Sequence, residues 1–445
     1  MNQEVAEATE EAAEDENDEA KAAEKAQHAA KQAELAYTQV TRIIVRRDTD
    51  SVKQLTPSQM MNLGGTIYRK YLYFPSVAVE IPLEALELLA QQDNVAGISE
   101  DSPTTRTVYD DIALVTGAMA AAKTYGGSGA GIGVAVIDSG IADVTDLQSS
   151  LMGRVDFTMF PDSSPFDPFG HGTHVAGIIA GDGISSNGTY GGIVSGAHLI
   201  DLRTLHANGM GYTSDAIAAV EWAIQHRDGL TEDGRSLNIR VINMSLGHTP
   251  WEAAETDPLS MISRMAVEHG IVVVAAAGNI GQIEGEEVYG GITSPGIEPS
   301  VITVGAVTAW GTSSRSDDTV AFYSSRGPTR YDEIIKPDIT APGTQIVAPM
   351  SPGNMLAMSY PQVVVDSNYM WLSGISMSAP MVSAAVALIL EQNPDLTPNA
   401  VKGILMYTAE DTAANPLQEG AGYLNIAGAV NLAATIDATV EEDEY

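Results

Sequence analysis

The stretch Gly133-Val-Ala-Val-Ile-Asp138 decides the fold class, because four consecutive apolar residues stand at its centre. An apolar run without alternation is typical of a strand that is buried on both faces of a sheet. Comparable runs follow at residues 199–202, 241–244, 272–276 and 301–304, and helical patterns lie between several of them at residues 175–180, 214–226 and 259–269. This alternation predicts an α/β fold with a mainly parallel sheet and helices on both faces.

A different pattern precedes this region, between residues 37 and 110. We predict strands at residues 41–46, 66–73, 76–81 and 95–99, and helices at residues 52–63 and 83–90. The order β-α-β-β-α-β is that of the split βαβ arrangement. The sequence therefore predicts a small α+β, ferredoxin-like domain, followed by a polar linker at residues 100–111.

Charge and composition restrict the classes of function. The 445 residues include 58 acidic and 22 basic ones, for a formal charge of -36. Such a chain repels phosphate backbones and anionic lipids, so we expect no nucleic-acid and no membrane partner. We also find no apolar stretch near the roughly 18 residues that a membrane-spanning helix needs. Cysteine is absent, which excludes disulfides, thiolate metal sites and a cysteine nucleophile.

The two ends of the chain are acidic. Residues 1–36 hold eleven acidic residues, three lysines and no aromatic residue, which is too little apolar surface for independent folding. We expect a solvated tail or a lone helix there, and an acidic tether is the alternative. Residues 437–445 are interpreted as a second acidic tail.

Two polar residues stand at element boundaries in the α/β region. Asp138 ends the first strand, where a carboxylate can orient an imidazole, although Asp before a turn glycine is also ordinary turn chemistry. His171 lies in the segment GHGTHVAG, residues 170–177, at the start of a helix of small residues. His174 follows three residues later, but a zincin pair needs a spacing of four and an adjacent Glu. We therefore expect His174 to be a hydrogen-bonded core residue rather than a metal ligand.

Two further residues complete the set. Asn279 follows the apolar run 272–276, so its amide is placed to donate to a developing oxyanion, unless it is only a turn residue. Ser376 lies in Ser373-Gly-Ile-Ser-Met-Ser-Ala-Pro380, before an apolar helix whose dipole favours a reactive oxygen; an N-cap serine is the alternative. The chain order Asp, His, Asn, Ser is far more specific than any one of these residues.

On these motifs the chain resembles the subtilisin-like serine peptidases, or subtilases, over about residues 40–436. The resemblance rests mainly on the HGTHVAG and G-x-S-M-S blocks. It implies a serine endopeptidase that hydrolyses polypeptide substrates through an acyl-enzyme. Asp138 would orient His171, the general base and acid. Ser376 would be the nucleophile, and Asn279 with the Ser376 backbone N–H would form the oxyanion hole.

The resemblance also places the substrate. The segment Ser245, Leu246, Gly247 matches one edge of a cleft, and Gly209 with Gly211 matches the opposite edge, so that an extended substrate is clamped as an added strand. The pocket for the residue before the scissile bond would be lined by Ala276, Ala277 and Gly278. Because these residues are small and uncharged, we expect a preference for large apolar side chains.

Residues 37–106 resemble the family's propeptide, an intramolecular chaperone and inhibitor, and residues 107–436 would be the catalytic domain. The chain would then be a self-processing zymogen that is cleaved within residues 103–108, and its own propeptide would be a partner. We expect a secreted monomer whose export signal is not present in this chain. No cofactor is expected for the chemistry. Structural calcium is common in the family, but the loop 182–192 has no ligand pattern that can be mapped. Residues 228–234, with three carboxylates, are a calcium candidate, and a solvated loop is the interpretation that we favour.

One departure and two alternatives complete the interpretation. Ile375 stands where the family usually has Thr, which removes a hydroxyl that would support the oxyanion hole. An inactive module that grips extended peptides in the same cleft is a second hypothesis, and labelling of Ser376 by a sulfonyl fluoride distinguishes it from an enzyme. A serine esterase of the α/β-hydrolase type needs G-x-S-x-G and the order Ser, Asp, His, and the chain has neither.

Overall fold

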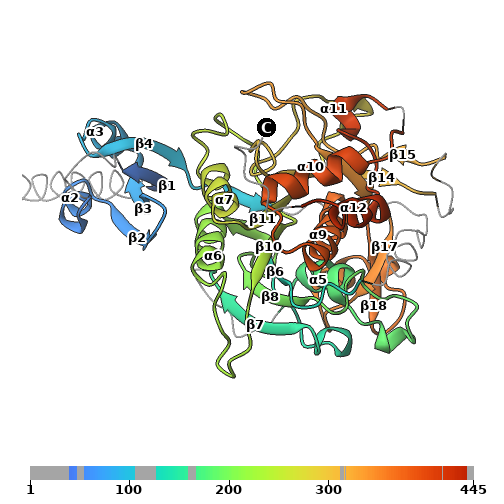
Figure 1. Cartoon of the computed structure of the whole chain (residues 1–445). Helices are drawn as coiled ribbons and strands as arrows, with labels where there is room; N and C mark the ends of the chain where they lie inside the picture. Colours follow the sequence, from blue (N-terminus) through green and yellow to red (C-terminus); the bar gives the residue numbers. More distant parts are fainter. Residues whose placement is uncertain are drawn as a thin grey trace, which may run out of the picture. The chain divides into compact units, whose positions relative to one another are not determined.

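The structure is a computed structural model that describes residues 40–47, 55–105, 127–158, 167–310, 315, 317–412 and 414–437. The chain divides into two compact units, drawn in Figure 1. The first comprises Met1–Lys70 and Pro75–Glu100, and the second comprises Tyr71–Phe74 and Asp101–Tyr445. The residues for which we predicted the N-terminal tail, 1–36, and almost all of those of the C-terminal tail, 437–445, lie outside the described residues.

The first unit is a four-stranded antiparallel sheet with short helices. Its elements are β1 (Val40–Arg47), α2 (Pro57–Asn62), β2 (Thr66–Lys70), β3 (Ser76–Pro82), η1 (Leu83–Ala85), α3 (Leu86–Ala90) and β4 (Val95–Glu100). The strand order β2-β3-β1-β4 is that of the predicted ferredoxin-like domain. Helix α2 begins at Thr56 because Thr56 and Gln59 form a reciprocal capping box. The predicted strand over residues 66–73 is too long, since the sheet pairing ends at Lys70.

The second unit is built on a mainly parallel sheet, as predicted. The strand order is β15-β14-β11-β10-β6-β8-β7, with β16 beside β14, and only the β14–β15 pair is antiparallel. The strands are β6 (Gly133–Asp138), β7 (Leu151–Asp156), β8 (His198–Arg203), β10 (Ile239–Met244), β11 (Val272–Ala276), β14 (Ile302–Thr308), β15 (Thr319–Val320) and β16 (Ile339–Pro342). Four of the five apolar runs predicted as strands fall within these elements, and the run 301–304 begins one residue before β14.

Helices cover both faces of this sheet (Figure 1). Helices α6 (Thr213–Gln225) and α7 (Pro258–Glu268) pack together on one side. Helices α5 (His171–Ala180) and α9 (Ile375–Gln392) pack together on the other, and α10 (Pro398–Thr408) and α12 (Ile426–Ala433) lie beyond them. The remaining named elements of this unit are β5 (Pro103–Thr105), η2 (Thr145–Leu147), η3 (Ile184–Ser186), β9 (Met210–Tyr212), β12 (Gln282–Ile283), β13 (Glu286–Glu287), β17 (Ile346–Pro349), α8 (Met355–Ser359), η4 (Pro361–Val363), β18 (Tyr369–Leu372) and α11 (Pro416–Glu419).

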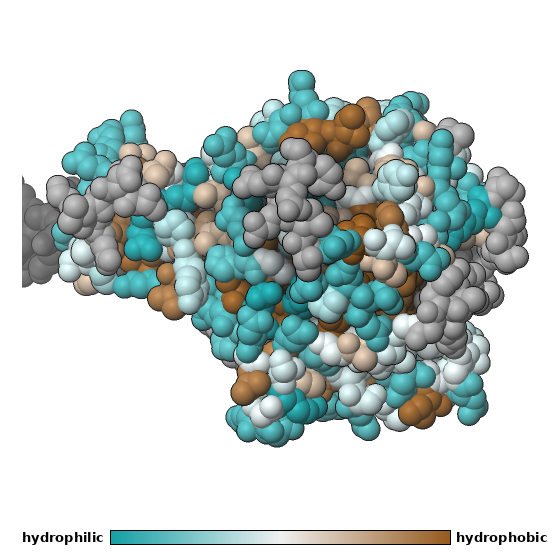
Figure 2. Space-filling view, in the orientation of Figure 1, coloured by the Kyte–Doolittle hydropathy of each residue, from teal (hydrophilic) through white to brown (hydrophobic). Residues whose placement is uncertain are grey.

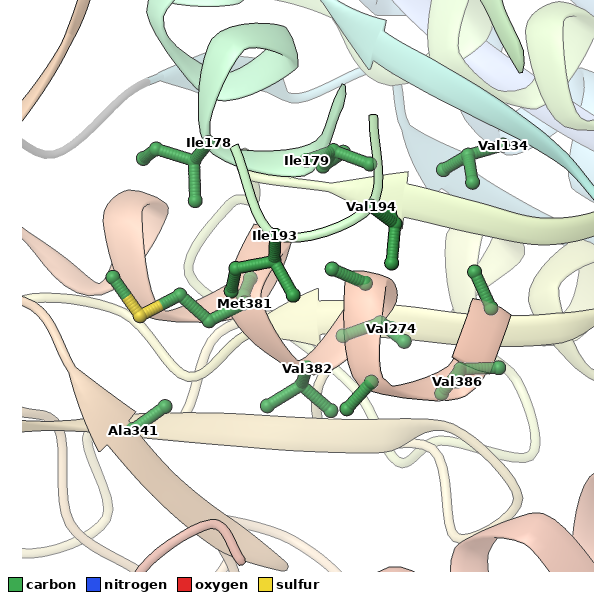
Figure 3. Close-up of a cluster of buried hydrophobic side chains, with 14 of the residues drawn as sticks. Val134, Ile178, Ile179, Ile193, Val194, Val274, Ala341, Met381, Val382 and Val386 are labelled. Atoms are coloured by element: carbon green, nitrogen blue, oxygen red, sulfur yellow. The ribbon is translucent and has the colours of Figure 1, made fainter. Parts of the chain in front are cut away.

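The core of the second unit lies between the sheet and helices α5 and α9. Figure 3 shows Ile178 and Ile179 of α5 and Met381, Val382 and Val386 of α9 in this cluster, together with side chains from the strands. Such burial supplies most of the driving force for folding. On the visible face, by contrast, hydrophilic residues predominate (Figure 2).

The expectation that no segment is apolar and long enough to cross a membrane is wrong for α9. This helix has 18 residues with a mean hydropathy of 1.4, and by length and composition alone it passes that test. However, 89% of the segment is buried inside the protein. Its apolar surface is therefore explained by the core, where it contacts β10, β11 and β14.

Candidate active site

Asp138 and His171 form a buried hydrogen-bonded pair. Asp138 is the last residue of β6, and His171 is the first residue of α5. The His171 Nδ1 atom lies 2.8 Å from Asp138 Oδ1 and 3.0 Å from Oδ2. The backbone N–H of Ser139 also donates to Asp138 Oδ1, at 2.7 Å. Gly170 is the N-cap residue of helix α5, and its φ of 98° lies in the left-handed region, which favours glycine.

The second ring nitrogen of His171 forms no hydrogen bond with the described residues. Its Nε2 atom is buried and has no hydrogen-bond partner among the residues that the structure describes. Because Nδ1 faces a carboxylate, the proton of the neutral ring belongs on Nδ1, and Nε2 is left as an acceptor. The pair therefore has the geometry of a general base that is oriented by a carboxylate.

Ser376 is the second residue of α9, and it forms hydrogen bonds with Ser245 in the segment that follows β10. The Ser376 hydroxyl donates to the Ser245 carbonyl at 3.0 Å, and not to His171. In return, the Ser245 hydroxyl donates to the Ser376 carbonyl, also at 3.0 Å. That carbonyl is available because Pro380, four residues further along the helix, has no N–H to donate to it.

The sheet register brings these two pairs to the same edge. Met244 of β10 is aligned with Ile137 of β6 in a parallel pair. The next residues on the two neighbouring strands are therefore Ser245 and Asp138. Since α5 and α9 also pack against each other, the Asp138–His171 pair and Ser376 are carried on adjacent elements at the carboxyl ends of the strands.

Asn279 lies beside the residue before Ser376. It follows β11, and its Oδ1 atom accepts a hydrogen bond of 3.2 Å from the backbone N–H of Ile375. Its Nδ2 atom is buried without a partner among the described residues. A free amide donor at this position is what an oxyanion hole requires. The Ile375 side chain, where we noted a missing hydroxyl, lies fully buried in an apolar cluster with Ala276 and Tyr323.

A segment of the chain itself lies along the predicted substrate edge. Strand β5 pairs antiparallel with β9, and Thr104 is aligned with Gly211. Gly209 has a left-handed φ of 74°, and a Cβ there would lie 2.6 Å from the Phe169 ring. Glycine at this position is therefore required by both backbone conformation and space.

A cavity lies next to Asn279 and has more lining residues than the sequence indicated for the pocket. A cavity of about 70 Å³ is lined by Leu246, Gly247, His248, Thr249, Ala276, Gly278, Asn279, Ile280 and Thr293. Ala277 is not among them, because it is fully buried and its N–H donates to Val304. A neighbouring cavity of about 370 Å³ shares Thr249, Ile280 and Thr293 with it. Sequence reasoning missed His248, Thr249, Ile280 and Thr293, although two of them directly follow the Ser245–Gly247 segment.

Metal candidates find no support in the described residues. No group of three or more His, Cys, Asp or Glu side chains in that part of the chain could hold a metal ion. His174 is a core residue, as predicted: its Nε2 atom lies 2.9 Å from the Ile346 carbonyl oxygen, and burial lowers its pKa to about 3. In the loop 228–234, Asp233 pairs with Arg235 at 2.8 Å.

An α/β protein with an oriented histidine, a serine and a free amide donor at one edge of a parallel sheet is a serine hydrolase of the acyl-transfer type. Residues 129–424 match the Subtilase family, and the chain belongs to this family of serine proteases.

Individual proteins show the same relationship. The chain is 40% identical over 306 residues to serine protease AprX of Bacillus subtilis, covering 68% of this chain and 67% of that protein. It is 31% identical over 371 residues to subtilisin E of Bacillus subtilis, covering 82% and 83% of the two chains. The crystal structure of fervidolysin from Fervidobacterium pennivorans has a TM-score of 0.66 and 21% identity, over 88% of this chain and 61% of that one. At this identity the likeness concerns the fold alone.

Proposed function

We propose that the chain is the zymogen of a secreted, monomeric endopeptidase, with Asp138, His171, Ser376 and Asn279 in the catalytic roles. The observation that carries the proposal is the buried Asp138–His171 pair, whose Nε2 atom is free on the side away from the carboxylate. The chemistry needs no cofactor.

The reaction would proceed through an acyl-enzyme. The Ser376 hydroxyl turns from the Ser245 carbonyl towards His171 Nε2, gives up its proton and attacks the peptide carbonyl. Asp138 stabilises the imidazolium that forms. The developing oxyanion accepts hydrogen bonds from Asn279 Nδ2 and the Ser376 N–H. His171 then protonates the leaving amine, and a water molecule releases the acyl group by the reverse sequence.

Residues 101–105 support self-processing. Asp101 Oδ1 accepts from the Ser214 N–H and Oδ2 accepts from the Ser214 hydroxyl, both at 2.7 Å, at the start of α6. The Thr213 hydroxyl donates to the Ser102 carbonyl at 2.8 Å. Strand β5 continues from this anchor along β9, as an extended substrate would. We therefore propose residues 37–106 as the propeptide and residues 107–436 as the catalytic domain, with cleavage within residues 103–108, of which 106–108 lie outside the described residues.

The pocket supports a preference for large apolar residues before the scissile bond. Its walls include Leu246, Ala276 and Ile280, and no Asp, Glu, Lys or Arg stands among its lining residues. The adjoining cavity gives a long side chain room beyond the first pocket.

The substitution Ser376→Ala tests the proposal. We expect turnover of a peptide substrate to fall by about 10⁶, a loss of the size known for a subtilisin nucleophile, and the chain to stay unprocessed. The measurements are the intact mass, the N-terminal sequence of the product and labelling by a sulfonyl fluoride. Ser378→Ala is the matched control, since Ser378 lies two residues away and its hydroxyl only donates to backbone carbonyls. Normal processing of Ser376→Ala would refute the mechanism. An unlabelled wild-type chain that still binds peptides would indicate the inactive peptide-binding module instead.

A further inference from the structure

A second buried carboxylate stands four residues before His171. Asp167 is fully buried, and its carboxylate accepts four hydrogen bonds. Oδ1 accepts from the Ser139 hydroxyl and the Gly170 N–H, both at 2.8 Å. Oδ2 accepts from the Thr173 N–H at 2.8 Å and from the Thr173 hydroxyl at 2.6 Å. None of the four catalytic roles uses this residue.

The directions of the two hydroxyl groups are fixed. The Ser139 oxygen accepts from the Gly172 N–H at 2.9 Å, and the Thr173 oxygen accepts from the Ala142 N–H, also at 2.9 Å. Each hydroxyl therefore points its own proton at Asp167. Four donors and no acceptor surround the carboxyl group, which suits the ionised form. Burial raises the pKa of Asp167, and the four hydrogen bonds oppose that rise.

The partners of Asp167 belong to both halves of the catalytic pair. Ser139 follows Asp138 and donates its N–H to that carboxylate. Gly170, the N-cap of α5, and Thr173, in its first turn, lie on either side of His171. Asp167 thus connects the end of β6 to the start of α5, and the 2.8 Å bond between Asp138 and His171 spans the same two elements.

We propose that Asp167 is a positioning residue for the Asp138–His171 pair: its four hydrogen bonds fix the two side chains relative to each other, and its buried negative charge favours the imidazolium. This inference rests on the proposed function, because it assigns the residue a role in preparing the general base. It differs from a merely structural role, since removal of a buried charge near the pair is expected to change the pH dependence of the rate as well as the rate itself.

Several other ionisable groups face this region. The Asp138 carboxylate lies on β6, and His171 and the neutral His174 lie on α5. On β8, Asp201 accepts from the Ile141 N–H at 2.9 Å, and burial raises its pKa, to which the charge of Asp167 adds. Arg154 of β7 lies 3.7 Å from Asp201, and Arg203 of β8 also acts on that carboxylate. Of these carboxylates, Asp167 accepts hydrogen bonds both from Ser139, the neighbour of Asp138, and from Gly170 and Thr173, which flank His171.

The test compares the full chain with Asp167→Asn, using a peptide substrate that has no titrating group. An amide presents only one acceptor atom, so two of the four donors lose their partner. Because a small misplacement of reacting groups costs up to about 10²-fold, we expect kcat/KM to fall by about 10- to 100-fold with KM nearly unchanged. Removal of the negative charge destabilises the imidazolium, so the acid limb of the kcat/KM profile moves to lower pH by about 0.5 to 1 unit.

Ser351→Ala is the control. The Ser351 hydroxyl donates at 2.6 Å to the backbone carbonyl of Asp167, so this variant loosens the same segment and keeps the carboxylate. Its acid limb is expected to stay in place. Rates are normalised to the fraction of Ser376 that a sulfonyl fluoride labels. An unshifted acid limb in Asp167→Asn, with a normalised rate equal to wild type, overturns the proposal.

A folding failure of Asp167→Asn and an inactive wild-type chain have different meanings. If Asp167→Asn does not fold, Thr173→Val and Ser139→Ala each remove one donor and keep the charge; normalised rates equal to wild type in both would then contradict a positioning role. If the wild-type chain neither cleaves peptides nor takes the label, it is the proposed function that fails.

Discussion

Replacement of Asn243 is expected to loosen the nucleophile without touching the substrate. Asn243 is the fifth residue of β10 and is fully buried. Its Nδ2 atom donates to the Ser245 hydroxyl at 3.0 Å, and its Oδ1 atom accepts from the Ser383 hydroxyl at 2.8 Å. The Ser245 hydroxyl in turn donates to the Ser376 carbonyl. A buried chain of hydrogen bonds therefore runs from the middle of α9 through the sheet to the first turn of the same helix.

The size of the effect follows from the groups that lose a partner. Asn243→Ala removes two hydrogen bonds, leaves the Ser383 hydroxyl without an acceptor and opens a small cavity. Each lost bond contributes about 1 kcal/mol and a buried orphaned hydroxyl costs about 1 to 3 kcal/mol, so we expect the free energy of unfolding to fall by about 3 to 5 kcal/mol. Ser383→Ala breaks one of these two bonds and leaves the buried Asn243 Oδ1 atom without a donor, but keeps the bond from Asn243 to Ser245, so we expect a smaller fall of about 2 to 4 kcal/mol.

Stability is best measured where self-digestion is impossible. Urea unfolding, followed by tryptophan fluorescence, would use the Ser376→Ala background, which keeps the carbonyl of residue 376. Turnover would use the active chain, where we expect kcat to fall by about 10-fold or more for Asn243→Ala, with KM little changed. Equal stability of the two variants, or an unchanged kcat for Asn243→Ala, would refute the view that this chain of hydrogen bonds holds the nucleophile.

Two further predictions concern the oxyanion and a buried amine. Asn279→Ala should lower kcat by about 10² to 10³, the loss seen when such a donor is removed from a subtilisin, and an unchanged kcat in steady-state assays would take Asn279 out of the oxyanion hole. Lys336 is buried, and burial lowers its pKa to about 7. In the unfolded chain this amine stays protonated up to about pH 10.4, so between about pH 7 and 10 the unfolded chain binds more protons than the folded one. The free energy of unfolding therefore rises with pH in this range, by at most about 1.4 kcal/mol per pH unit from this group. Lys336→Met should lack this rise in urea unfolding at pH 7 and 9; identical slopes for the two proteins would count against it.

The sequence was most informative where a pattern repeats or a motif is contiguous. The run 134–137 predicted β6, and the HGTHVAG block placed His171 at a helix start, where α5 begins. The predicted helix at residues 175–180 was too short, because glycines at positions 170 and 172 mask the first turn. Ser376 was likewise expected just before an apolar helix, whereas helix α9 begins at Ile375 and includes it.

Single polar residues without a pattern could not be found in this way. Asp167 gains the hydrogen bond from Ser139, and Asn243 the one from Ser383, only when segments far apart in sequence meet in the fold. The same holds for Thr293, which reaches the pocket wall from a loop that follows β13. Ala277 was assigned to the pocket from the family resemblance, whereas in the structure it is fully buried in an apolar cluster.

The proline in the first turns of α9 has a mechanical consequence. Because Pro380 cannot donate to the Ser376 carbonyl, that end of the helix is fastened to the segment after β10 by the two Ser245–Ser376 bonds. The position of Ser376, the proposed nucleophile, is therefore tied directly to the segment after β10 as well as to the helix that contains it. A displacement of residues 245–247 would be passed to Ser376 through these two hydrogen bonds. In the proposed enzyme, a peptide bound along the same segment would shift together with the attacking oxygen, so that their separation would change little.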